Sequence, residues 1–148
     1  MSAFAAFLHH LAAFTLVAAL AVEFALLRGA PTAPDLRRLR LADAVYGVSA
    51  GVILVVGFLR VLYLEKGAAY YFHSGTFIAK LALFAVIGLL SIYPTMQFLR
   101  WGRAAGPAAA PTAAEVQRVR RLLHFELALL VPLILCAALM ARGIGFFG

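Results

Sequence analysis

The chain has 148 residues, of which 65% are hydrophobic and 13% charged, and its formal net charge is +7. A soluble domain carries about 25% charged residues, so this composition excludes a water-covered globular protein and indicates lipid as the main solvent. The basic residues flank apolar segments and form no basic face interleaved with aromatic residues, so we expect a lipid bilayer as partner and no nucleic acid. The predicted fold class is all-α, an integral membrane four-helix bundle.

Four apolar segments are long enough to cross a bilayer. The predicted spans cover residues 4–27, 41–64, 76–101 and 115–141 and make up a single transmembrane domain over residues 1–148. The first span would be about 36 Å long as a helix, against about 30 Å of hydrocarbon. It contains an acidic residue, Glu23, and nothing basic precedes His9, so we do not interpret it as a signal peptide.

The segments between and within the spans carry recognisable signals. Residues 28–40 contain two prolines and four arginines and are predicted to form a basic loop. Thr112 followed by Glu115 is typical of a capping box at a helix start. Gly47 and Gly51 form a small-xxx-small pair, which we interpret as a face where helices of the bundle pack, not as a dedicated dimer face. Several aromatic residues fit interfacial belts on the two sides of the membrane: Tyr63, Tyr70, Tyr71, Tyr93 and Trp101.

Basic residues are distributed unequally between the two sides of the predicted bundle. Nine of the 13 Lys and Arg residues fall in the first and third connections. The positive-inside rule assigns these connections to the cytoplasm of a bacterial inner membrane. Both termini and the 60–80 connection are therefore expected on the periplasmic side, an N-out/C-out arrangement. The nine are Arg28, Arg37, Arg38, Arg40, Arg100, Arg103, Arg118, Arg120 and Arg121.

Polar side chains gather at the expected periplasmic side. If the third helix extends back to His73, a spacing of seven residues puts His73 and Lys80 on one helix face. Two histidines from different helices could bind a heme iron, with Arg60 or Lys80 pairing with its propionates. The alternative is that these histidines are interfacial and that Lys80 extends its ammonium group to the membrane surface. The candidate cofactor-binding residues are His9, His10, Arg60, His73 and Lys80, with Glu65 and Lys66 nearby.

A second polar group is expected at the cytoplasmic side. Ionisable residues inside a span cost roughly 2.5–3.5 kcal/mol at the bilayer centre, so each needs a partner. One interpretation is a structural network around His124, and the other is a proton relay or a second cofactor site. The inner polar network is predicted to contain Glu23, Asp43, His124 and Glu126, with Tyr46, Gln97 and Arg121 beside it.

Motifs of several enzyme classes are missing from the sequence. It contains no HExxH, CxxC, P-loop or Gly-rich dinucleotide motif. The classes of soluble enzyme that depend on these motifs are therefore not expected. Whether the chain is an enzyme at all stays open. No metal site is predicted.

Three stretches of the chain resemble a known family. They are LHHLAAFTLVAALAVEFALL, DAVYGVSAGVILVVGFLRVLYLEKGAAYYFHSGTFIAKLALFAVIGLLSIYPTMQFLRW and ALMARGIG. They look like the "domain of unknown function 2214" family of predicted bacterial inner-membrane proteins, which implies a four-helix topology and no assigned activity.

A more distant similarity involves a histidine in the first helix and an AKLAL motif that opens a later one. It resembles the heme-linked oxidase HemJ and the CopD-like proteins, and it implies roles for His10 and Lys80. Where HemJ commonly has a histidine two positions before the lysine, this chain has Ile78, and the Tyr/Phe-His pair that follows in HemJ falls near Ser91.

The leading functional hypothesis is that the periplasmic cluster binds b-type heme or a porphyrin for redox chemistry. Two alternatives stay open. One is a proton-coupled transporter of ions or small solutes, favoured by ionisable residues in both halves. The other is a non-catalytic accessory or assembly subunit. A homo-oligomer is compatible with the composition, because four such helices bury little polar surface alone, but the sequence names no residue for it.

Overall fold

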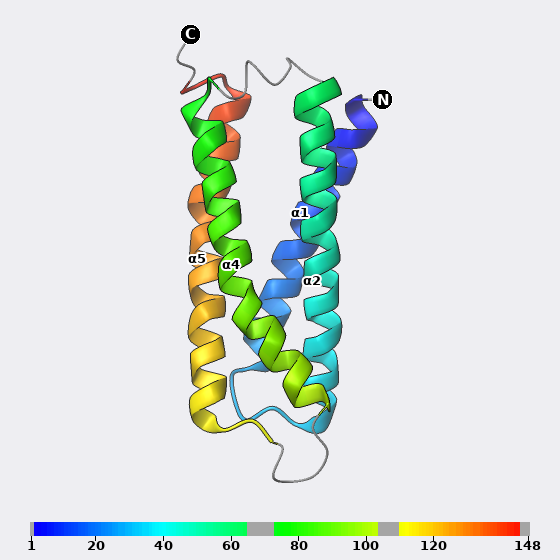
Figure 1. Cartoon of the computed structure of the whole chain (residues 1–148), viewed down its shortest axis with the longest axis vertical. Coiled ribbons are helices and arrows are strands. Elements are labelled where there is room, and N and C mark those ends of the chain that lie inside the picture. Colours follow the sequence, from blue (N-terminus) through cyan, green and yellow to red (C-terminus); the bar gives the residue numbers. More distant parts are fainter. Residues whose placement is uncertain (1, 65–72, 104–109, 146–148) are drawn as a thin grey trace.

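The computed structural model describes residues 2–64, 73–103 and 110–145, and most of that length is helical (Figure 1). Some residues of the predicted periplasmic cluster and aromatic belt lie outside these ranges: Glu65, Lys66, Tyr70 and Tyr71. A short π-helix, η1, directly continues the second α-helix. The elements are α1 (Ser2–Leu26), α2 (Ala33–Leu59), η1 (Arg60–Leu64), α4 (Gly75–Arg103) and α5 (Ala113–Ala141). All four α-helices are long and apolar enough to cross a membrane, which confirms the predicted all-α, four-helix fold class.

The helices associate as two antiparallel pairs. α1 packs mainly on α2 and α4 on α5, and the contacts between the pairs are fewer. Figure 1 shows the pairs converging at one end, where α4 slants toward α2, and standing apart at the other. Both termini lie at that other end, which we call the terminal end.

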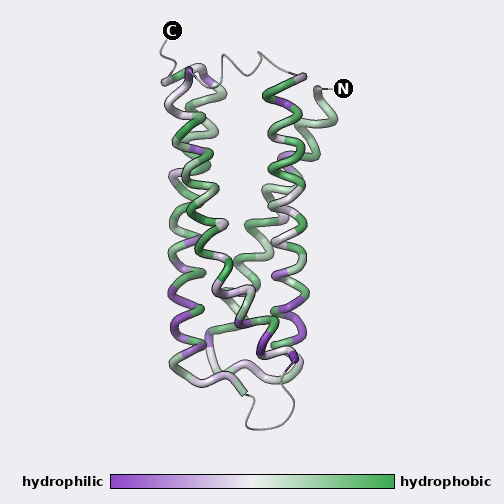
Figure 2. The backbone as a smooth tube through the Cα atoms, viewed as in Figure 1, coloured by the Kyte–Doolittle hydropathy of each residue, from purple (hydrophilic) through white to green (hydrophobic). Residues whose placement is uncertain are grey.

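The opposite end, which we call the arginine end, carries the nine arginines of the first and third connections. Figure 2 shows hydrophilic residues concentrated there, while the rest of the helices is mostly hydrophobic. Large apolar side chains remain exposed along the helices, among them Phe14, Val48, Leu89 and Val131, each about 70% exposed. Such outward-facing apolar surface suits a lipid environment.

α2 begins earlier than the sequence analysis expected. Residues 33–40, predicted as loop, form its first two turns. Asp35 accepts hydrogen bonds from the backbone nitrogen and the hydroxyl of Thr32, at 2.9 and 2.6 Å. Pro34 is tolerated because the first helical turn needs no backbone donor at its position. The prediction gave too much weight to proline and missed the Thr-x-x-Asp start signal.

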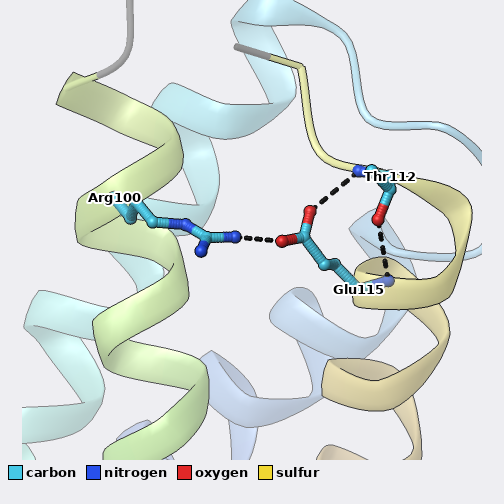
Figure 3. Close-up of polar contacts among 3 residues, drawn as sticks. All are labelled: Arg100, Thr112 and Glu115. Carbon is cyan, nitrogen blue, oxygen red and sulfur yellow. Dashed lines mark hydrogen bonds and ion pairs between the residues drawn. The ribbon is translucent and has the colours of Figure 1, made fainter.

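The capping box predicted at Thr112 is confirmed, and it also ties α5 to α4 (Figure 3). Glu115 accepts from the backbone nitrogen of Thr112 at 2.9 Å, while its own backbone nitrogen donates to the Thr112 hydroxyl. The second function of the Glu115 carboxylate is an ion pair with Arg100, near the end of α4. One side chain therefore fixes the start of α5 and its position beside α4.

The main core lies toward the arginine end. Leu20, Leu39, Phe98 and Leu123 come from four different helices and are each at most 1% exposed. Trp101 was predicted as part of an interfacial belt, but it is buried in this core, with its ring centroid 5.8 Å from that of Phe98. The tightest packing therefore holds the two helix pairs together where they converge.

Gly47 and Gly51 do not mediate packing within the chain. A Cβ atom added at either glycine would meet nothing within 4 Å, and both residues are exposed on the outer side of α2. The interpretation of this pair as a packing face inside the bundle is therefore wrong. Tyr46 and Ser49, which face the bundle from the same stretch of α2, are buried instead.

The C-terminal turn caps the start of α4. The Gly75 backbone nitrogen donates to the carbonyl of Gly145 at 2.9 Å, and the Thr76 hydroxyl donates to the carbonyl of Ile144 at 3.0 Å. Gly143 and Gly145 both have positive φ, 72° and 94°. The turn therefore satisfies a helix-start donor that would otherwise lack an intrahelical partner.

Replacement of Gly145 by alanine should loosen this cap. Its φ is unfavourable for a side chain, and a Cβ would lie 2.7 Å from Cγ2 of Thr76. We expect local destabilisation of roughly 1–3 kcal/mol. Hydrogen exchange of the Gly75 amide should speed up about fivefold or more. Gly29→Ala is the control, because a Cβ at Gly29 meets nothing within 4 Å. Equal exchange rates in both variants would contradict the cap.

Candidate functional site

A cavity of about 100 Å³ lies in the terminal half of the bundle. α1, α2, η1, α4 and α5 all contribute to its wall, and it is partly open. Among the described residues that line it, the polar side chains are those of His9, Arg60 and Lys80, and all three are basic. The apolar walls include Phe58, Phe77, Leu81, Phe84 and Met140.

His9 enters the cavity from α1. Its ring hydrogen-bonds the backbone of Ile53 on α2, and within the described chain its buried Nδ1 has no hydrogen-bond partner. A backbone carbonyl that accepts from one ring nitrogen leaves the other nitrogen with a lone pair. The approach of the ring to α2 depends on Gly57, because a Cβ there would lie 3.4 Å from Cε1 of His9. His9 therefore presents a nitrogen that can accept a proton or bind a metal.

Arg60 and Lys80 reach the same cavity from different elements. Arg60 is the first residue of the π-helix η1, and Lys80 lies in the second turn of α4. Both side chains are half-buried. Short π-helical segments occur frequently at functional sites, because they shift the direction of the following side chains. Three of the five predicted cofactor-binding residues, His9, Arg60 and Lys80, are thus brought together.

His10 and His73 do not line this cavity. His10 is exposed, and its Nδ1 lies 2.6 Å from the carbonyl oxygen of Ala6 on its own helix. His73 is also exposed and precedes the start of α4 at Gly75, so the helical spacing that would align it with Lys80 does not apply. A site with two histidines facing each other across the cavity is not formed by these residues.

Two glutamates are buried toward the arginine end. Glu23 of α1 is 2% exposed and Glu126 of α5 is 0% exposed. Oε1 of each carboxyl group has no hydrogen-bond partner in the part of the chain that the structure describes. Glu23 lies close enough to Asp43 and Glu126 to interact with them electrostatically. Three carboxyl groups from three helices therefore form one cluster.

Hydroxyl groups hold two of these carboxylates. The Tyr46 hydroxyl donates to Oε2 of Glu126 at 3.3 Å, which joins α2 to α5. The Thr95 hydroxyl donates to Oδ1 of Asp43 at 2.6 Å, which joins α4 to α2. Sequence reasoning missed Thr95, because a threonine near a helix end carries no distinctive signal. Together these bonds link α2, α4 and α5.

His124 is separate from this cluster. It is exposed, and its ring centroid lies 6.1 Å from that of Phe24, over whose ring Arg120 also stacks. Side chains two positions apart on an α-helix are rotated by about 200° around its axis, so His124 and Glu126 cannot face the same neighbour. Of the predicted inner network, Glu23, Asp43 and Glu126 are brought together and His124 is not. No group of three or more His, Cys, Asp or Glu residues able to hold a metal ion occurs among the described residues.

Comparison with known proteins connects this architecture to a family. The family model "Predicted membrane protein (DUF2214)" matches residues 1–145. The chain belongs to the DUF2214 family. No curated protein and no solved structure matches it significantly. The resemblance to this family is thus confirmed, while the distant similarity to HemJ and the CopD-like proteins stays a prediction.

In this DUF2214 protein, the match includes both polar sites. It covers the helices that carry His9, Arg60 and Lys80 and those that carry Glu23 and Glu126. The family description is that of a predicted membrane protein and names no activity. Arguments about function therefore rest on the chemistry of these two sites.

Tyr46→Phe should weaken the inner cluster. The change deletes the hydroxyl that donates to Glu126, and phenylalanine keeps the ring packing. Hydrogen bonds between membrane helices contribute about 1 kcal/mol, so we expect a loss of that size in unfolding free energy. Denaturant-induced unfolding in bicelles would measure it. Tyr63→Phe is the matched control, because Tyr63 is 76% exposed. A loss as large in Tyr63→Phe would contradict the assigned role of the Tyr46 hydroxyl.

Proposed function

We propose that this membrane protein binds an amphipathic acid, with b-type heme or a porphyrin as the leading candidate, in the cavity at its terminal end. The observation that carries the proposal is the meeting of His9, Arg60 and Lys80 in a cavity that is otherwise apolar. An acidic group would pair with Lys80 or Arg60, because charge-assisted hydrogen bonds to carboxylates are among the strongest in proteins. The apolar walls would contact the remainder of the ligand.

The donor atoms of the cavity are compatible with a heme held by one histidine. Nδ1 of His9, which has no hydrogen-bond partner among the described residues, would bind the heme iron, and Arg60 and Lys80 would pair with the propionates. Ligation by His10 and His73 together does not fit, because neither lines the cavity. A heme bound in this way would supply one-electron redox chemistry. The residues of the chain would orient it and neutralise its carboxylates.

The size of the cavity limits how the ligand is held. Pockets that enclose a small molecule measure about 300–1,000 Å³, and this one measures about 100 Å³. The enclosed space therefore suits the acidic edge of a larger molecule. Because the cavity is only partly enclosed, the apolar part of the ligand would extend beyond it into lipid, so we expect ligands to enter from the membrane and not from water.

Binding of hemin and of metal-free protoporphyrin to the purified protein in nanodiscs tests the proposal. His9→Ala should abolish the Soret shift produced by axial ligation. Lys80→Met should weaken the binding of both probes by roughly 30-fold or more, since loss of one partner of a buried charge pair costs about 2–5 kcal/mol. His10→Ala is the matched control, because it removes an adjacent imidazole that is exposed.

Three results would count against the proposal. Failure of the wild-type protein to bind either porphyrin would exclude the leading candidate. Equal losses of porphyrin binding in His9→Ala and His10→Ala would show that binding does not take place in the cavity. A Lys80→Met protein that folds and binds like the wild type would favour a non-catalytic accessory subunit, in which Lys80 only extends to the membrane surface.

A further inference from the structure

Two buried glutamates lie toward the arginine end of the bundle, away from the cavity, and the proposed function does not involve them. Glu23 and Glu126 are at most 2% exposed. An ionised carboxylate in such surroundings needs a cation or several hydrogen-bond donors. Among the described residues, this pair accepts a hydrogen bond from the Tyr46 hydroxyl, at 3.3 Å to Glu126. If the two carboxyl groups were ionised, their Oε1 atoms would therefore need a further positively charged partner.

The groups that α2 and α4 place around this pair are negative or neutral. On α2 these are the carboxyl group of Asp43 and the hydroxyl of Tyr46, and α4 contributes Thr95, which donates to Asp43. α5 carries two cationic or titratable neighbours, Arg120 and His124. Both lie against the ring of Phe24, and His124 is exposed.

The ion pairs of the described chain leave this pair out. Among the described residues, ion pairs join Arg38 to Asp35 and Arg100 to Glu115, both at helix starts near the arginine end. A multivalent metal is also not indicated, since no group of three metal-ligating residues occurs in the ranges that the structure covers. A proton is the remaining cation that needs only one or two oxygen atoms.

We propose that Glu23 and Glu126 form a proton-binding site, in which both carboxyl groups carry a proton at neutral pH and exchange it with the arginine end. Protonation turns each carboxylate into a neutral carboxylic acid, which removes the mutual repulsion within the cluster and the need for a neighbouring cation. Asp43 lies one turn nearer the arginine end than Tyr46 and is half-buried. It is the group through which protons would enter.

Infrared spectroscopy of the protein in liposomes tests this site directly. The wild type should show protonated carboxyl bands at neutral pH that shift when only glutamate is labelled with ¹³C. The chain has only six acidic residues, so assignment is tractable. Glu23→Gln and Glu126→Gln should each remove one band. Glu115→Gln is the matched control, because its carboxylate forms an ion pair at a helix start and should contribute no such band.

Transfer of the liposomes into D₂O tests the entry route. In Asp43→Asn the glutamate bands should keep their amplitude but shift more slowly than in the wild type. Unchanged exchange in this variant would overturn the route through Asp43.

Two results would overturn the proton site itself. One is the absence of a glutamate-dependent carboxyl band in the labelled wild-type protein, a measurement that needs no variant to fold. The other is loss of the band when Na⁺ is added at constant pH, which would identify a sodium site. Neither result depends on porphyrin binding, so this inference and the proposed function can fail separately.

Discussion

A polar side chain between the ends of this bundle must find its partner inside the protein, because hydrocarbon offers none. This constraint explains the arrangement of the Tyr46–Glu126 and Asp43–Thr95 bonds, each of which joins two helices. In water such bonds would compete with solvent and contribute little. In lipid they also specify which helix faces meet, since a rotated helix would expose its carboxylate to the membrane.

The two helix pairs are held together unequally along their length. The main core and the hydroxyl–carboxylate bonds lie toward the arginine end, where α4 approaches α2. At the terminal end the pairs stand apart, and the small cluster of Val61 and Phe77 is joined there by Met140. The two pairs are therefore held together most firmly toward the arginine end.

In the candidate sites, the position of a residue around its helix decides whether its side chain faces the interior of the bundle. His9 and His10 are chemically identical and adjacent, yet one lines the cavity and the other bonds the backbone of its own helix. Glu126 is buried while His124, two residues earlier, is exposed. All four residues stand out in the sequence as polar residues within apolar spans. It could not choose between them, because weak amphipathicity leaves the inward face of each helix undefined.

By itself, the sequence determined the class of protein, the four helices and the capping box at Thr112, because these follow from apolar length and local hydrogen bonding. The early start of α2 was also readable from Thr32 and Asp35, although proline obscured it. Tertiary structure alone decided which ionisable residues meet. The rotation of each helix about its axis depends on packing against its neighbours. Because apolar residues occur on every face of each helix, the sequence does not indicate which face points inward.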